Sequence, residues 1–223
     1  MIIVGTNPQT SHQAFALCEN EVGLFPTAGI HPHDAALHAD ASRAEIAALC
    51  RRKECVAVGE TGLDWFRNLS PRAAQLDNFR WHLELARELE LPIIVHSRDA
   101  HEDTLSLLRE FRGVRGVMHC YTLGAAELAP YLELGMFISF SGVVTYPKNT
   151  LNRAAAQAVP SERLLVETDC PFLAPEGRRG KRNEPALVRL VLEHIATVRG
   201  VEFEELALQT SRNAAELFAL ERG

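Results

Sequence analysis

Short apolar runs alternate with longer segments of helical periodicity along the whole chain. Several of the runs are apolar throughout, as in Ile93-Ile94-Val95, which is typical of a strand that is buried on both faces. Seven runs have the length and composition of strands: Ile2–Val4, Phe25–Ile30, Val56–Gly59, Pro92–His96, Val114–Cys120, Met136–Ser139 and Leu164–Thr168.

The segments between these runs carry helix signals. Ser70-Pro71 can begin one helix, and apolar residues then recur at helical spacing as far as Leu89. Asn183 can cap a later helix that has Pro185 in its first turn. Because strands and helices alternate, we expect parallel strands joined by right-handed crossovers.

Polar residues follow strand after strand at its carboxyl end. An open doubly wound sheet would have the same alternation of elements, but catalytic residues at the carboxyl ends of many strands are typical of a (β/α) barrel. We therefore expect an α/β fold of the TIM-barrel type, with seven strands instead of eight. The polar strand ends are Gly29–His33, Gly59–Asp64, Val95–Asp99, Met118–Tyr121 and Glu167–Pro171.

Length and composition favour one domain without a membrane anchor. The chain has 223 residues and a formal net charge of −6, and no apolar run approaches the length of a membrane span. Its start has neither the basic nor the long apolar region of a signal peptide. An odd number of cysteines, five, without a CxxC pair suggests reduced thiols and a cytoplasmic location. The acidic balance argues against broad non-specific binding of nucleic acid, although it leaves room for a local basic patch.

Histidines and acids in series at strand ends point to a divalent metal. A single histidine there would more often be a hydrogen-bonded core residue than a ligand. A series of buried ionisable groups, however, costs several kcal/mol for each unpaired member, and one metal site can satisfy several together. Imidazole and carboxylate donors suit zinc, manganese or magnesium.

The motifs GETGLD, HSRDA, HCYT, ETDCPFLAP and RGKRNEP occur in this order, and the chain resembles the TatD family of metal-dependent deoxyribonucleases. The resemblance extends from about Gly5 to Phe218. It implies a variant of the amidohydrolase-like TIM barrel with two divalent metal ions, Mg²⁺, Mn²⁺ or Zn²⁺, at the C-terminal face.

The resemblance also implies roles for individual residues. Glu60 matches the carboxylate that bridges the two metals, and His96 and His119 match the histidines of the second metal. Asp169 matches the aspartate of the first metal, near the water that attacks the substrate. Glu60 and Asp169 are therefore the expected catalytic residues.

Further residues are expected to contact the substrate. His31 matches a histidine that lines the family's pocket, and Arg98 and Tyr121 lie in two of the shared motifs. Arg179 and Lys181 belong to a basic loop that follows the Asp169 strand, where it can hold phosphates. His33 fits a functional and a structural role equally well, and the other histidines fit surface or packing positions.

The chain departs from the family pattern at its start. Family members begin with a strand ending in His-x-His and a helix, and those two histidines complete the first metal site. We expect residues 1–223 to form a single barrel domain that lacks this unit, binds one metal well and has impaired activity. Either Met1 is an internal methionine of a longer gene product, or the protein is shortened.

Three functions remain open from the sequence. The first is hydrolysis of phosphodiester bonds in DNA, as an exonucleolytic DNase. The second is metal-dependent ester hydrolysis, such as deacylation of D-aminoacyl-tRNA, because substrate choice depends on loops. The third is a binding module or an inactive fragment. We expect nucleic acid as the partner, without a membrane and without an obligate protein partner.

Overall fold

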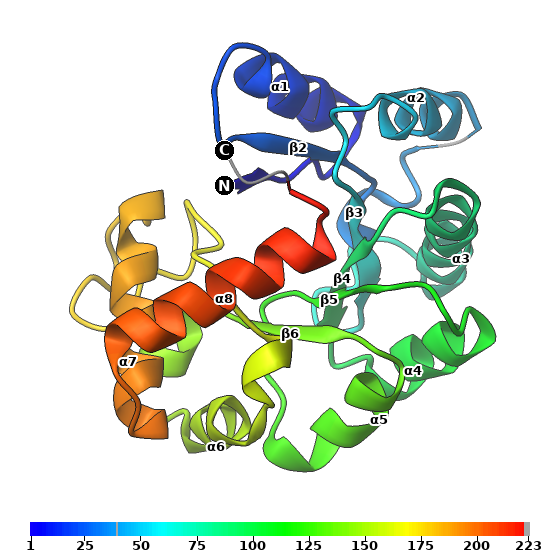
Figure 1. Cartoon of the computed structure of the whole chain (residues 1–223). Coiled ribbons are helices and arrows are strands. Elements are labelled where there is room, and N and C mark those ends of the chain that lie inside the picture. The colour runs from blue at the N-terminus through cyan, green and yellow to red at the C-terminus, as the bar shows by residue number, and fades with distance from the viewer. Residues whose placement is uncertain (39, 221–223) are drawn as a thin grey trace. The chain divides into compact units, whose positions relative to one another are not determined.

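The computed structural model describes residues 1–38 and 40–220. The described part of the chain forms seven strands, which follow one another in the sheet in chain order, with helices between them (Figure 1). The number of strands and the α/β alternation predicted from the sequence are confirmed. No described helix is long and apolar enough to cross a membrane.

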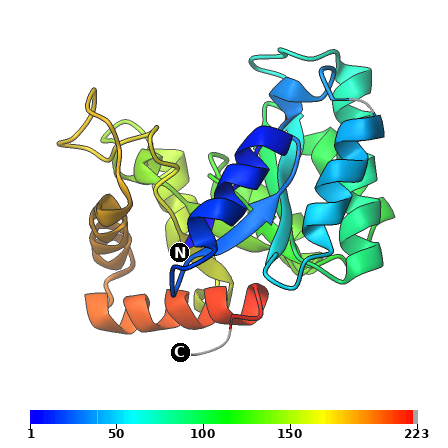
Figure 2. The ribbon, with the colours of Figure 1, turned by 90° about the horizontal axis from the view of Figure 1, so that it is seen from above.

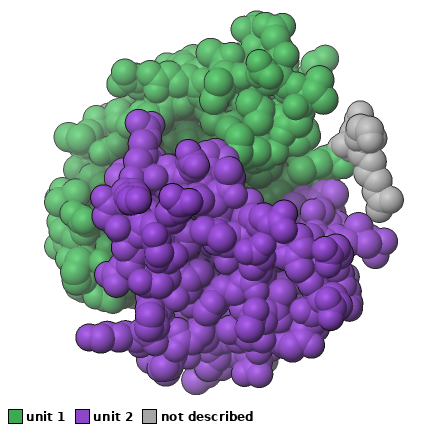
Figure 3. Space-filling model, turned by 90° about the vertical axis from the view of Figure 1, so that its left-hand side faces the viewer, with its two compact units in different colours: residues 1–117, 218–223 green, residues 118–217 purple. Residues whose placement is uncertain are grey.

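The chain divides into two compact units, coloured separately in Figure 3. Unit 1 comprises Met1–Val117 together with the C-terminal residues from Phe218, and unit 2 comprises Met118–Leu217. The division falls within strand β5 (Gly116–Met118). Whether the whole chain behaves as a single domain stays a prediction.

Unit 1 contains four parallel strands and the helices that follow them. The strands are β1 (Ile2–Ile3), β2 (Phe25–Ala28), β3 (Ala57–Asp64) and β4 (Ile93–Arg98). The helices are α1 (Pro8–Cys18), α2 (Asp40–Cys50), α3 (Arg72–Leu89) and α4 (His101–Glu110), and a 3-10 turn, η1, covers Pro32–Asp34. Helix α1 lies alongside β2 (Figures 1 and 2).

The sequence explains how these elements begin and where they pack. Helix α1 has a capping box, in which Asn7 accepts a hydrogen bond from the backbone of Thr10 and Thr10 accepts one from the backbone of Asn7. Pro8 occupies the first helical turn, where its missing N–H costs nothing. The interior of unit 1 is apolar, with fully buried side chains that include Ile30, Leu63, Phe79, Leu83 and Ile93.

Unit 2 contains the parallel pair β6 (Phe137–Phe140) and β7 (Leu164–Val166). Its helices are α5 (Leu128–Glu133), α6 (Thr150–Ala158), α7 (Val188–Arg199) and α8 (Phe203–Leu217). Its 3-10 turns are η2 (Ala125–Glu127), η3 (Gly142–Thr145), η4 (Ser161–Arg163) and η5 (Pro185–Leu187). Tyr131, Met136, Ile138, Phe140 and Leu164 form much of its buried interior.

All seven strands begin or end a few residues away from the predicted ranges, and one predicted helix cap is not formed. Strand β3 continues to Asp64 instead of ending at Gly59, because residues 61–64 pair in parallel with residues 95–98 of β4. Asn183 does not cap a helix: its side-chain amide donates hydrogen bonds to the carbonyls of Thr168 and Phe172, and α7 begins only at Val188.

Candidate metal centre

Three side chains carried by or directly following neighbouring strands of unit 1 converge. Glu60 lies in β3, His96 lies in β4, and His31 follows β2. Their potential ligand atoms all lie within 4.8 Å of one another. Glu60 Oε1 is 3.1 Å from His96 Nδ1 and 3.4 Å from His31 Nε2. Glu60 is buried, with 8% of its surface exposed, so its charge needs partners of this kind.

Glycines allow the strands that carry these residues to approach closely. Gly62 lies opposite His96 in the β3–β4 register, and a Cβ atom at Gly62 would lie 2.0 Å from the carbonyl oxygen of His96. Gly62 and Gly59 also have positive φ angles, of 135° and 134°, that side chains disfavour. The glycines of the GETGLD motif are therefore a packing requirement of the strand that carries Glu60.

His31 is arranged as a hydrogen-bond donor. Its Nδ1 atom accepts the backbone N–H of His33 at 3.2 Å, so the neutral ring carries its proton on Nε2, which faces Glu60. Burial lowers the pKa of His31, and Glu60 opposes this effect only in part. The proton on Nε2 suits donation to an oxygen, either the Glu60 carboxylate or a substrate phosphate, better than ligation of a metal.

A second carboxylate, Asp64, supports the histidines of unit 1. Asp64 Oδ2 lies 2.7 Å from His33 Nε2 and 3.4 Å from His96 Nε2. Burial opposes ionisation of Asp64, but hydrogen bonds from His96, the Arg67 backbone and His33 outweigh it and hold the pKa of this carboxyl well below its ordinary value. Asp64 is thus an anion that can orient two imidazole rings.

The sequence left the role of His33 open and gave Asp64 none. The structure pairs His33 with Asp64, and the His33 ring contacts the His31 ring edge-on at a centroid distance of 4.3 Å. The sequence feature that could have indicated this partner for His33 is the aspartate at the end of the GETGLD motif.

Unit 2 contains a corresponding group around His119. Its Nδ1–H donates to Glu167 Oε2 at 3.0 Å, and the Ser139 hydroxyl donates to the same oxygen at 2.6 Å. This tautomer leaves the lone pair of His119 on Nε2, which lies 3.6 Å from Asp169 Oδ1. A histidine oriented by a carboxylate through its other ring nitrogen is the usual arrangement of a metal ligand.

Sequence reasoning assigned no role to Glu167, although it directly follows the apolar run of β7. Within the described part of the chain, its buried Oε1 atom has no hydrogen-bond partner. A buried carboxylate oxygen of this kind needs a water or a cation, so the donor set of unit 2 fits a cation site.

The four predicted metal ligands therefore fall into two pairs. Glu60 and His96 meet in unit 1, and His119 and Asp169 meet in unit 2. The bridging of two metals by Glu60, which the family resemblance implies, stays a prediction.

The predicted substrate residues differ in accessibility. Tyr121 is buried, its hydroxyl donates to the Gly124 carbonyl, and its ring packs against Tyr131 and Phe140. Arg98 is exposed at the end of β4. The Tyr121 side chain therefore lies within the interior of unit 2, whereas Arg98 is open to solvent.

The basic loop that contains Arg179 and Lys181 is exposed. The Arg179 guanidinium lies 4.5 Å from the centre of the Tyr146 ring and 3.9 Å from Glu176. Arg179 is thus partly held in place, whereas no ion pair is recorded for Lys181 among residues 1–38 and 40–220.

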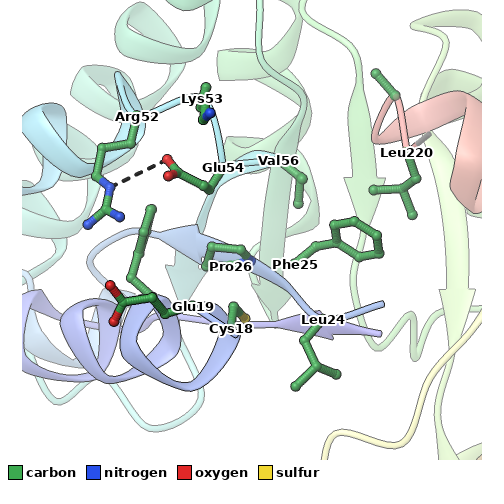
Figure 4. Close-up of a pocket in the computed structure, with 12 residues that line it drawn as sticks. Cys18, Glu19, Leu24, Phe25, Pro26, Arg52, Lys53, Glu54, Val56 and Leu220 are labelled. Carbon is green, nitrogen blue, oxygen red and sulfur yellow. Dashed lines mark ion pairs between the residues drawn. The ribbon is translucent and has the colours of Figure 1, made fainter. Parts of the chain in front are cut away.

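A hollow of about 430 Å³ lies at the other end of the strands of unit 1 (Figure 4). Leu24 and Phe25, at the start of β2, line it together with the segment that precedes β3. Arg52 and Glu54 form an ion pair at its edge, at 3.5 Å. Catalytic residues of parallel α/β barrels lie at the carboxyl ends of strands, so this hollow is not the candidate centre.

Known proteins resemble the chain over nearly its whole length. It is 40% identical over 99% of its residues to the uncharacterized metal-dependent hydrolase YabD of Bacillus subtilis, and it covers 87% of that protein. It is 39% identical over 99% of its residues to the 3'-5' ssDNA/RNA exonuclease TatD of Klebsiella pneumoniae and again covers 87% of the relative.

The crystal structure of YjjV, a TatD homologue from Escherichia coli, matches with a TM-score of 0.92 and 28% identity, covering 99% of this chain and 86% of that one. The phosphotriesterase homology protein of the same species matches with a TM-score of 0.66 at 14% identity, which shows a shared fold only. The predicted TIM-barrel type is therefore confirmed. The family model described as TatD related DNase matches residues 1–219, and the chain belongs to this family, as its motifs predicted.

Proposed function

We propose that this chain is a divalent-metal-dependent hydrolase that cleaves phosphodiester bonds of nucleic acid. The observation that carries the proposal is the meeting of Glu60 and His96 at 3.1 Å, with His31, as a hydrogen-bond donor, 3.4 Å from the same carboxylate oxygen. The names of the relatives support it, since one is a metal-dependent hydrolase and another is an exonuclease on single-stranded DNA and RNA.

The donors fit a divalent cation. We assign Glu60 and His96 as ligands in unit 1, and His119 and Asp169 as ligands in unit 2. These groups supply carboxylate oxygens and imidazole nitrogens, which suit Mg²⁺, Mn²⁺ or Zn²⁺. When bound, such an ion lowers the pKa of a water molecule and polarises the phosphoryl group.

The remaining residues of the centre act on the substrate or on the ligands. His31 donates from Nε2 to a phosphate oxygen, in line with its hydrogen bond from the His33 backbone. Asp64 and Glu167 fix the rings of His96 and His119. Asp169 accepts a proton from the attacking water, and Arg98, Arg179 and Lys181 supply positive charge for the phosphates.

Exonuclease assays with metal titration test the proposal. The chain, freed of metal with EDTA and then given Mn²⁺, should shorten a 5'-labelled single-stranded oligonucleotide from its 3' end. Glu60→Gln and Asp169→Asn should each remove most of the activity, because an amide is a poor metal ligand. Glu45→Gln, a change in an exposed carboxylate of α2, should leave the rate unchanged.

Other outcomes would redirect the assignment. Deacylation of D-aminoacyl-tRNA without cleavage of DNA or RNA would assign the centre to ester hydrolysis. Binding of oligonucleotide without turnover at any Mn²⁺ concentration would make the chain a binding module. A count of bound ions by elemental analysis separates one tight site, which we expect, from two.

A further inference from the structure

An aromatic side chain, Phe66, is exposed immediately beyond the metal centre. Phe66 follows β3 by two residues and has 61% of its surface exposed. The Arg98 guanidinium lies 3.9 Å from the centre of its ring. Since a cation covers one face of the ring at this distance, the exposed surface belongs to the opposite face and the edges. The ring is thus a flat apolar surface that faces solvent.

The loop that presents Phe66 is held firmly on both sides. The Trp65 N–H donates to the Arg98 carbonyl at 2.9 Å, and the Arg67 N–H donates to Asp64 Oδ1 at 2.7 Å. The Trp65 indole N–H donates to Asp103 at 2.8 Å. An exposed ring on a fixed loop loses little conformational entropy when it binds a ligand.

Three arginines lie in or beside the loop that carries Phe66. Arg67, Arg72 and Arg98 are exposed, and the Arg72 guanidinium lies over the Trp65 ring at 4.7 Å. Within residues 1–38 and 40–220, no carboxylate forms an ion pair with any of these three arginines. Their charges are therefore available to an anionic ligand.

The ring also lies within reach of the metal centre. Asp64 is 3.4 Å from His96, and two residues of chain span about 7 Å at most. In the strand register Asp64 lies opposite Arg98, two residues beyond His96. A phosphate at Glu60 and His96 would therefore leave Phe66 within reach of an adjacent nucleotide.

We propose that Phe66, supported by Arg98, is a stacking platform for an unpaired base of a single-stranded nucleic acid whose phosphate lies at the metal centre. This inference rests on the proposed function and adds the residue that holds a base beside the metal centre. An exposed ring with a flanking guanidinium fits a base in an unpaired strand, whereas bases within a duplex offer no free face.

A second copy of the chain is the rival occupant. Leu37 and Leu69 are also exposed. Leu69 follows Phe66 by three residues, and the Ser70 hydroxyl joins its loop to the Leu37 loop through hydrogen bonds with Ala36 and His33. The arginines around Phe66 favour the nucleic acid, because like charges from a second copy would repel one another.

Equilibrium binding of fluorescent oligonucleotides with phosphorothioate linkages, which resist cleavage, tests the proposal on the chain loaded with Mn²⁺. The probes are single-stranded oligothymidylate, an abasic oligomer of the same length, and a duplex. The proposal predicts that Phe66→Leu weakens binding of oligothymidylate by about 5- to 150-fold, the range for one base stacked on an aromatic ring, and affects the abasic oligomer much less. Phe66→Trp should retain tight binding.

The matched control is Leu17→Ala, which removes an exposed apolar side chain near the carboxyl end of α1. It should bind both single-stranded probes like the original chain. Equal weakening of the abasic and base-bearing probes by Phe66→Leu would overturn the stacking role. A concentration-dependent dimer that Phe66→Leu dissolves, with unchanged oligonucleotide binding, would replace it with self-association.

The test separates this inference from the proposed function. Hydrolysis of a small chromogenic phosphodiester by the unaltered chain depends on the metal centre and offers no stacked base. If the chain cleaves this ester and Phe66→Leu leaves oligothymidylate binding unchanged, only the stacking proposal fails. If the ester is not cleaved although the base-selective binding defect appears, only the proposed reaction fails.

Discussion

Asp64 Oδ2 lies 2.7 Å from His33 Nε2, and this contact joins the end of β3 to the turn that follows β2. The same carboxylate oxygen lies 3.4 Å from His96. One buried anion therefore orients two rings, one of which we assign as a metal ligand.

Asp64→Asn is expected to weaken binding of Mn²⁺ by about 10- to 100-fold, the usual effect of removing a carboxylate that orients a ligating histidine. The amide keeps the size of the side chain but loses the charge. Isothermal titration calorimetry measures the affinity. Glu45→Gln breaks an exposed histidine–carboxylate contact, to His12, and should leave the affinity unchanged. An unaltered affinity in Asp64→Asn would confine Asp64 to a structural role.

Glu167→Gln is expected to lower kcat by about 10- to 100-fold with little change in KM, because His119 loses the charged acceptor that sets its tautomer. Steady-state kinetics on a single-stranded oligonucleotide measure both constants. Glu167→Asp should restore part of the rate, and Glu162→Gln, in the exposed turn η4, should behave like the original chain. A rise in KM alone would instead make Glu167 a substrate contact.

Replacing Arg179 and Lys181 together with alanine is expected to weaken binding of oligonucleotides of any sequence and to reduce the slope of log K against log salt by about 1 to 2. Fluorescence anisotropy at several salt concentrations gives this slope. The control removes two exposed charges elsewhere in unit 2, with Arg189→Ala and Arg212→Ala. If both double variants change the slope equally, the loop has no specific role.

The buried histidine His82 is expected to make folding sensitive to acid. Burial lowers its pKa to about 3, and its Nε2 atom accepts the backbone N–H of Ile30. Because the unfolded chain binds a proton near pH 6.5 and the folded chain does not, the free energy of unfolding should fall as the pH decreases below about 6.5. The contribution of one such group is at most about 1.4 kcal/mol per pH unit, and it ends near the folded pKa.

Urea unfolding between pH 4 and pH 7 measures this effect. His82→Gln retains hydrogen-bonding atoms without a group that titrates in this range, so its stability should depend less steeply on pH. Parallel curves for the two proteins would show that His82 does not cause the acid sensitivity.

Much of the fold was predictable because each element satisfies a local rule. Apolar runs such as Ile93-Ile94-Val95 are buried in the strands they predicted, and the helix expected after Ser70-Pro71 extends from Arg72 to Leu89. The strand ends that carry Glu60 and His96 were also visible, since an acid or histidine directly follows an apolar run.

Residues whose role depends on a tertiary contact were not predictable in the same way. Tyr121 lies in a motif beside His119, yet its side chain points into the interior of unit 2. Asp64 contacts His33, which lies 31 positions earlier in the chain, and Glu167 contacts His119, which lies 48 positions earlier. Spacing along the sequence does not encode these pairings, because they form only when strands are in register.

The glycines around Glu60 restrict where this protein can acquire new specificity. A methyl group at Gly62 would collide with the backbone of His96, and one at Gly29 would lie 2.6 Å from Gly59. These glycine positions therefore tolerate almost no substitution, whereas the loop around Phe66 is open to solvent and can vary. Directed evolution towards another substrate would find its adaptive changes in that loop, with the catalytic strands inherited unaltered.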